Sequence, residues 1–198
     1  MAVGFSGSGG GITYPLKKIE NYWNFTENVG KKLNLKYVDY FINNVCNLRC
    51  KHCYVAYENK DNELTVEEWQ RAFDSCIDLG ARVFGNVGKE PLLNWDKTKS
   101  ILSYFNKKRE IEGKIKFGIV TNGLLMDNEK AEELRELNLD YIDISIDGIE
   151  NTHDIIRGKG TYKKTIQNIS KLANVGLQGK VFISHTLNRL NLDSFSSL

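Results

Sequence analysis

The chain has 198 residues, of which 41% are hydrophobic and 26% are charged, and its formal net charge at pH 7 is +2. These values are typical of one globular domain, or of a domain with a tail, that buries a core. The nearly balanced charge argues against binding to nucleic acid or to an anionic membrane surface. No apolar run reaches the roughly 18–20 residues that a membrane-spanning helix needs, and the N-terminus lacks a secretion-signal pattern. We therefore expect a cytoplasmic protein without nucleic-acid or membrane partners.

The beginning of the chain differs in composition from the rest. Residues 1–11 are rich in glycine and serine, which predicts a flexible lead. We expect residues 1–35 as a whole to form a flexible or accessory segment. From residue 36 onward, strand and helix patterns alternate. Strands are predicted at 37–42, 82–87, 116–121, 141–146 and 181–185.

Helices are predicted between these strands. The first begins at a capping box of Thr65 and Glu68 and ends at Gly80. The others are expected at 97–107, at 127–137 with Asp127 as its cap, and at 161–175, and a fifth is expected to begin at Asp193. Three sets of residues are expected in the core: Ile101, Leu102 and Phe105 on the second helix, Ile166, Ile169, Leu172 and Ala173 on the fourth, and Cys76 on the first.

Alternating strands and helices indicate an α/β fold with a parallel sheet covered by helices. About five strand–helix units are visible, so we predict an open or partial (β/α) barrel. The chemistry of such folds lies at the carboxyl ends of the strands. The polar motifs described below all follow a predicted strand directly.

Three of the four cysteines, Cys46, Cys50 and Cys53, lie within eight residues in a C-x3-C-x2-C pattern. Their crowding makes two disulfides geometrically unfavourable and favours metal binding in a reducing compartment. Three thiolates on a four-iron cluster would leave one iron without a protein ligand, open for chemistry. Two other interpretations stay open: a zinc ion with His52 as fourth ligand, and three thiols buried on a helix face. The polar neighbours and the lack of a second ligand pair favour the cluster.

The cysteine pattern, with the aromatic His52 just before its last cysteine, resembles the signature of the radical S-adenosylmethionine (SAM) enzymes. The resemblance implies a [4Fe–4S] cluster held by the three cysteines and SAM chelated to the open iron, with His52 against the adenine. It also implies the reaction. An electron from the cluster cleaves SAM to a 5′-deoxyadenosyl radical, which abstracts hydrogen from a substrate.

Two further motifs agree with this resemblance. Gly88-Lys89-Glu90-Pro91 is similar to the Gly-Gly-Glu-Pro element of the family, which binds the SAM amino group. The chain departs from that element at Lys89, where the family usually has glycine. Thr121-Asn122-Gly123 is similar to the Thr-Asn-Gly element of the family. The resemblance therefore places Gly88 to Glu90, Thr121 and Asn122 among the cofactor-binding residues.

A block of motifs resembles the subgroup that modifies peptides and proteins. It runs from Ser145-Ile146-Asp147-Gly148 through His153-Asp154 and Arg157-Gly158 to Thr161-Tyr162 and Thr165-Ile166-Gln167-Asn168-Ile169. That subgroup includes the sulfatase-maturating enzymes and the SPASM-type peptide maturases. The resemblance implies that Ser145 contacts the SAM ribose and that Arg157 contacts the SAM carboxylate. It puts Asp147 in the same cofactor site, binding directly or supporting its neighbours. His185 and Asn188, at the end of the fifth predicted strand, are further candidates to face this site.

The resemblance covers residues 36–190 and leaves out parts of the family's usual fold. The family barrel has six units, so we expect residues 36–198 to be a radical SAM core that lacks the last unit and any C-terminal auxiliary-cluster domain. The expected function is radical modification of a peptide or protein, with flavodoxin or ferredoxin as the reductant. The alternatives are a radical SAM enzyme for a small molecule, or a non-catalytic scaffold that binds a cluster or zinc.

Overall fold

The computed structural model describes residues 35–55 and 63–193. The chain divides into two compact units, Met1–Leu35 and Lys36–Leu198. The predicted flexible lead, nearly all of the predicted accessory segment and the body of the helix expected from Asp193 lie outside the described residues.

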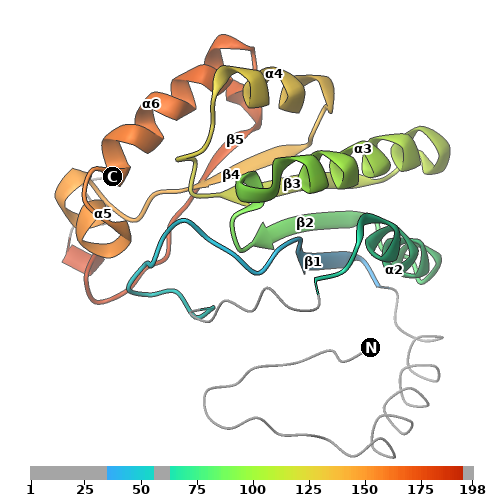
Figure 1. The fold of residues 1–198 in the computed structure, drawn as a ribbon, viewed down its shortest axis with the longest axis horizontal. Coiled ribbons are helices and arrows are strands. Elements are labelled where there is room, and N and C mark those ends of the chain that lie inside the picture. Colours follow the sequence, from blue (N-terminus) through green and yellow to red (C-terminus); the bar gives the residue numbers. More distant parts are fainter. Residues whose placement is uncertain (1–34, 56–62, 194–198) are drawn as a thin grey trace, which may run out of the picture. The chain divides into compact units, whose positions relative to one another are not determined.

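Five parallel strands form one sheet in the order β1-β2-β3-β4-β5. Each strand therefore pairs with the next strand in the sequence, as expected for successive strand–helix units. This confirms the predicted α/β class with a parallel sheet, which is open and has five strands in the described part of the chain (Figure 1). The strands are β1 (Tyr37–Phe41), β2 (Val83–Gly88), β3 (Lys116–Thr121), β4 (Tyr141–Ser145) and β5 (Val181–Ser184).

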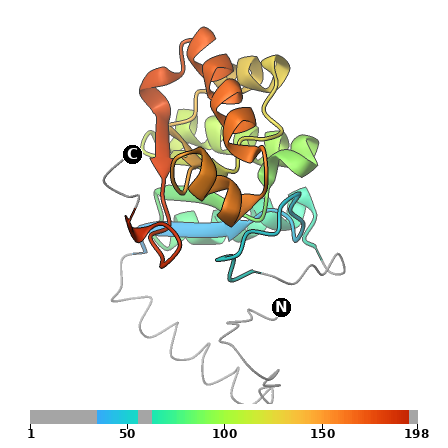
Figure 2. The same cartoon turned by 90° about the vertical axis from the view of Figure 1, so that its left-hand side faces the viewer.

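Helices connect the strands and pack along the sheet (Figure 1). None of the helices in the described part of the chain is long and apolar enough to cross a membrane. At the carboxyl ends of the strands, α5 and the loop after β1 lie close together (Figures 1 and 2). The helical elements are α2 (Val66–Asp78), η1 (Pro91–Asn94), α3 (Trp95–Glu112), α4 (Asn128–Glu136), α5 (Glu150–Arg157), α6 (Thr161–Asn174) and η2 (Gln178–Lys180).

Two helix starts confirm the sequence prediction. Thr65 and Glu68 form the reciprocal capping box of α2, and the Asp127 side chain accepts the Lys130 N–H at the start of α4. Each side chain satisfies a backbone donor that has no partner inside the helix. Gly80, with φ of 103°, follows the end of α2 as predicted.

An aromatic layer joins the helices to the sheet. Phe105 on α3 is fully buried, and its ring lies 4.6 Å from Phe84 of β2, 4.8 Å from Phe73 of α2 and 5.7 Å from Phe117 of β3, between ring centroids. The predicted core positions Ile101 and Leu102 are also fully buried. This layer anchors the strands whose ends carry the candidate site.

The structure differs from the sequence prediction in three further respects. The helix predicted at 97–107 runs from 95 to 112, because its charged last turns continue the helix without an apolar face. The helix α5 was not predicted: it has eight residues, and its N-cap residue Ile149 provides no side-chain cap. Cys76, predicted to be in the core, is only half-buried.

The face that α6 buries is largely polar, which corrects the predicted apolar face. Ile166 is 42% exposed and Ala173 is exposed, whereas Thr165 and Asn168 are each 1% exposed. Of the four residues predicted for this face, only Leu172 is fully buried. The polar side chains are buried because they bind the loop after β3, as described below.

His153 joins α5 to the end of β4. It is 1% exposed, its Nδ1 accepts a hydrogen bond from the Asp147 N–H (3.2 Å), and its ring meets that of Tyr162 edge-on. Burial lowers the pKa of His153 below its ordinary value of 6.5, and the nearby Arg157 lowers it further. A neutral ring is thus part of the folded state.

We expect the Phe105→Ala substitution to lower the free energy of unfolding by about 3–5 kcal/mol, because it leaves a cavity at the centre of the aromatic layer. Urea unfolding followed by circular dichroism measures this change. Ile111→Ala on the same helix, where Ile111 is 78% exposed, is the matched control and should change stability by no more than about 0.5 kcal/mol. Similar losses in both variants would contradict this assignment of the core.

We expect the stability of the protein to fall as the pH drops below about 6.5, because the unfolded state then binds a proton that buried His153 resists. The stability associated with neutral His153 is therefore fully present above the unfolded pKa and is lost on acidification. His153→Gln should reduce the difference in unfolding free energy between about pH 7.5 and 5.5. Burial also lowers the pKa of His52, so His52 should account for part of the pH dependence that remains in the variant. An unchanged pH dependence in the variant would refute this role of His153.

Candidate cofactor site

The residues that the sequence predicts as a cofactor site lie at the carboxyl ends of four neighbouring strands. The cysteine loop follows β1, Gly88 ends β2, Thr121 ends β3 and Ser145 ends β4. Arg157 ends α5, the helix that follows β4. Figure 2 views the domain from this end, with the cysteine loop in cyan and α5 in orange.

Backbone N–H groups of the cysteine loop, residues 42–55, form hydrogen bonds with other segments of the domain. The Lys51 N–H donates to the Ile156 carbonyl on α5 (2.9 Å). The Asn44 N–H donates to Glu63 Oε1 (2.8 Å), and Glu63 Oε2 in turn pairs with Lys97 on α3 (3.3 Å). These contacts tie the loop to α5 and, through Glu63, to α3.

Donor groups and a cation face the sulfur atoms of this loop. The Leu48 N–H points at Cys46 Sγ (3.4 Å), and an Arg157 guanidinium nitrogen lies 3.9 Å from Cys50 Sγ. Burial raises the pKa of both thiols, and the nearby Arg157 opposes this rise at Cys50. None of the four cysteines, all of which lie among the described residues, forms a disulfide, and Cys53 is exposed. Such donors stabilise thiolate ligands.

The donor set fits a four-iron cluster better than a zinc ion. Within residues 35–55 and 63–193, no three Cys, His, Asp or Glu side chains are placed to hold one metal ion. His52, the fourth ligand in the zinc interpretation, instead has its Nε2 3.7 Å from Asp147 Oδ2. In a four-iron cluster each thiolate binds a different iron, so the sulfurs need not converge on one point. The exposure of Cys53 disagrees with three buried thiols.

Glu90 links the ends of three strands. Its side chain is 1% exposed, and its carboxylate accepts hydrogen bonds from the Thr121 hydroxyl (2.6 Å), the Asn122 N–H (2.9 Å) and the Leu92 N–H (3.1 Å). Its backbone carbonyl accepts from Asn43 Nδ2 (2.8 Å), in the loop after β1. Burial raises the pKa of Glu90, and these donors and Arg157 oppose the rise. The predicted residues Glu90, Thr121 and Asn122 are thus brought together.

Asn122 connects the loop after β3 with the cysteine loop and α6. Its Nδ2 donates to Asn47 Oδ1 (2.8 Å) and lies 4.0 Å from Cys46 Sγ. Its carbonyl accepts from the Thr165 hydroxyl (3.0 Å), while Asn168 Nδ2 donates to the Gly123 carbonyl (2.8 Å). The polar face of α6 therefore holds the loop that carries Asn122.

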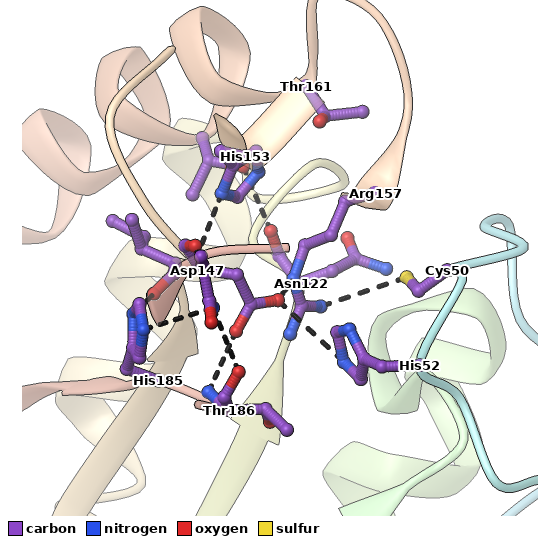
Figure 3. Close-up of polar contacts among 12 residues, drawn as sticks. Cys50, His52, Asn122, Asp147, His153, Arg157, Thr161, His185 and Thr186 are labelled. Carbon is purple, nitrogen blue, oxygen red and sulfur yellow. Dashed lines mark hydrogen bonds and ion pairs between the residues drawn. The ribbon is translucent and has the colours of Figure 1, made fainter. Parts of the chain in front are cut away.

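Asp147 and Arg157 form a buried ion pair beside the cysteine loop (Figure 3). Asp147 is fully buried, and its Oδ2 accepts from Arg157 Nε (2.5 Å). Its Oδ1 accepts the Thr186 N–H (2.8 Å) from the loop after β5. The pair brings two predicted site residues together and joins them to β5.

The remaining predicted residues surround these contacts. A Cβ atom at Gly88 would lie 2.5 Å from the Phe41 ring, so packing requires glycine there. The Lys89 N–H donates to the Asn43 carbonyl (3.2 Å), and Ser145 lies opposite Ser184 of β5. His52 Nδ1 is buried and has no hydrogen-bond partner in the described part of the chain.

His185 and Asn188 form contacts of their own at the end of β5. The His185 ring nitrogens lie 2.9 Å from the Ile146 carbonyl and 3.1 Å from Asn191 Nδ2. The Asn188 side chain binds Thr186 and Leu190 within its own loop. His185 therefore supports the end of β4, and Asn188 stabilises its own loop.

The sequence analysis missed several residues that hold the site. Asn43 and Glu63 act through contacts that span 47 and 19 residues of sequence, for which no local signal exists. Thr165 and Asn168 could have been found, because with Thr161 and Leu172 they occupy one helical face.

Comparison with known proteins gives the chain's family. The radical SAM superfamily profile matches residues 40–197. Fe-coproporphyrin III synthase of Methanosarcina barkeri is 33% identical over 150 residues, covering 74% of this chain and 36% of that protein. The sporulation killing factor maturation protein SkfB of Bacillus subtilis is 30% identical over 162 residues, covering 79% of this chain and 37% of that protein. The chain thus spans little more than a third of these relatives.

Among solved structures, SuiB of Streptococcus suis bound to S-adenosylmethionine has a TM-score of 0.69 and 18% sequence identity, covering 92% of this chain and 42% of SuiB. SuiB has also been crystallised with its precursor peptide SuiA. At this identity, the likeness supports the fold. The predicted family, with its [4Fe–4S] cluster and SAM as cofactors, is confirmed, and this chain belongs to the radical SAM superfamily.

Proposed function

We propose that the whole protein is an enzyme that cleaves SAM reductively and uses the resulting radical to modify a peptide or protein. The observation that carries this proposal is the set of three cysteines on one anchored loop, beside the buried Arg157 and Glu90. Cys46, Cys50 and Cys53 would hold the cluster and leave one iron open. The bound cofactors supply the electron and the 5′-deoxyadenosyl radical that takes hydrogen from the substrate. The protein binds, orients and shields them.

Arg157 is suited to hold the SAM carboxylate. Asp147 occupies its Nε and fixes the plane of the guanidinium group. The terminal N–H groups of arginine can donate two parallel hydrogen bonds to a carboxylate. The side chain is only 10% exposed, so water competes little for these donors.

Glu90 and Gly88 would hold the SAM amino group. The carboxylate has a charge opposite to that of an ammonium group, and the hydrogen bonds from Thr121 and Asn122 keep it in place. Asn43 also fixes the backbone here, because its carbonyl accepts the Lys89 N–H and its Nδ2 donates to the Glu90 carbonyl. Thr121 and Asn122 therefore act through Glu90 and the cysteine loop.

Ser145 and His52 would contact the adenosine part of SAM. Ser145 ends β4, and its hydroxyl can bond a ribose hydroxyl. His52 lies between Cys50 and Cys53. Its buried Nδ1 has no hydrogen-bond partner among the described residues and can bind a polar atom of a ligand.

A peptide substrate is supported by two of the similar proteins. SkfB is a maturation protein, and SuiB binds a precursor peptide. The Ser145–Arg157 block also resembles the peptide-modifying subgroup. Flavodoxin or ferredoxin is the proposed reductant. A small-molecule substrate is the second candidate, because Fe-coproporphyrin III synthase is a similarly close relative.

We expect alanine at Cys46, Cys50 or Cys53 to abolish both the brown cluster absorption and SAM cleavage, because each thiolate holds a different iron. Anaerobic reconstitution, iron analysis and chromatography of 5′-deoxyadenosine measure these losses. Cys76→Ala, which removes the cysteine of α2, is the matched control and should retain about four irons per chain. Retention of SAM cleavage in all three loop variants would refute the assignment of the cluster to these cysteines.

We expect 5′-deoxyadenosine to acquire deuterium from a perdeuterated peptide extract, because the radical takes hydrogen from its substrate. The extract is separated by size from the small molecules of the same cells, and mass spectrometry detects the label. Cys50→Ala should give no labelled product. Deuterium transfer from the small-molecule fraction alone would favour the second candidate over a peptide.

A further inference from the structure

Asp147 has both of its carboxylate oxygens engaged by the protein itself. Oδ2 accepts from Arg157 Nε at 2.5 Å, and Oδ1 accepts the backbone N–H of Thr186 at 2.8 Å. The carboxylate is fully buried. His52 Nε2, at 3.7 Å from Oδ2, is the next polar neighbour of this oxygen. Of the two roles that the sequence leaves open for Asp147, direct binding of the cofactor or support of its neighbours, these contacts favour support.

Arg157 is held between Asp147 and the cysteine loop. Its Nε faces Asp147, and NH1 on the same guanidinium lies 3.9 Å from Cys50 Sγ (Figure 3). The backbone next to it is fixed as well, because the Ile156 carbonyl accepts the Lys51 N–H. One ion pair therefore places a cation against one particular cysteine sulfur.

We propose that Asp147 is a positioning residue that directs Arg157 toward Cys50 Sγ and balances its charge, and that this buried pair sets the reduction potential of the cluster. The inference rests on the proposed function, since it requires a cluster on Cys50. It gives Asp147 a role that is separate from binding SAM.

The physical basis is the charge of the two redox states. A reduced cluster carries one more negative charge than the oxidised cluster, so a nearby cation stabilises the reduced state and a nearby anion destabilises it. Net charge and hydrogen bonds to the sulfurs are known determinants of cluster potentials. The pair is buried and therefore weakly screened by salt.

The test compares midpoint potentials of reconstituted protein, measured without SAM by redox titration with electron paramagnetic resonance (EPR) detection. Asp147→Asn keeps one oxygen for the Thr186 N–H, but its amide N–H group then faces Arg157 Nε–H, donor against donor. The guanidinium is no longer directed toward Cys50, so the potential should shift negatively. Arg157→Gln removes the cation, so the potential should shift negatively. In the double variant the two shifts should not add, because the residues are in contact.

Asp140→Asn is the matched control. Asp140 also accepts a backbone N–H, that of Phe117 (2.9 Å), and pairs with an arginine, Arg109 (3.5 Å), but at the amino end of β3. Its substitution should leave the midpoint potential unchanged. If the substitutions acted only by lowering stability, Asp147→Asn and Asp140→Asn would give the same midpoint potential.

An unchanged potential in Asp147→Asn, or additive shifts in the double variant, would overturn the inference while the proposed function stands. If Asp147→Asn does not fold, Arg157→Gln decides alone, and the absence of a negative shift overturns the inference. A wild-type protein that takes up no cluster would overturn the proposed function and this inference with it.

Discussion

The buried carboxylate of Glu90 is the contact on which the candidate site depends. It binds donors from the end of β3 and the start of η1, and its own backbone is bound from the loop after β1. An isolated carboxylate would be costly to bury. Here three donors compensate that cost, and removing any one of them would leave a buried polar group unsatisfied, at about 1–3 kcal/mol. These hydrogen bonds therefore fix the ends of β1, β2 and β3 in one arrangement relative to one another.

A second set of polar contacts completes the site at the carboxyl ends of β3, β4 and β5. Asp147 joins Arg157 to the loop after β5, and the polar face of α6 holds the loop after β3. Buried polar networks of this kind specify a unique arrangement when every member is satisfied. The apolar core anchors the strands, and the polar networks fix the positions of the groups at their ends.

The sequence predicts the parts of this structure that follow local rules. The capping box at Thr65, the buried face of Ile101, Leu102 and Phe105, and the order of the motifs along the chain are all confirmed. It could not predict contacts between distant residues. The brace from Glu63 to the cysteine loop and the contact of Asn43 with Glu90 depend on tertiary structure. The eight-residue α5 lacks a side-chain cap, so local signals did not reveal it.

The central claim is that three cysteines hold a cluster whose fourth iron is open to SAM. The most direct measurement is the EPR spectrum of the reduced, reconstituted wild-type protein before and after SAM is added. If SAM binds the open iron, the g values and line shape of the cluster signal should change. SAM that carries 17O or 15N in its methionine part should then show hyperfine coupling between the label and the cluster. Identical spectra and no coupling would contradict the claim.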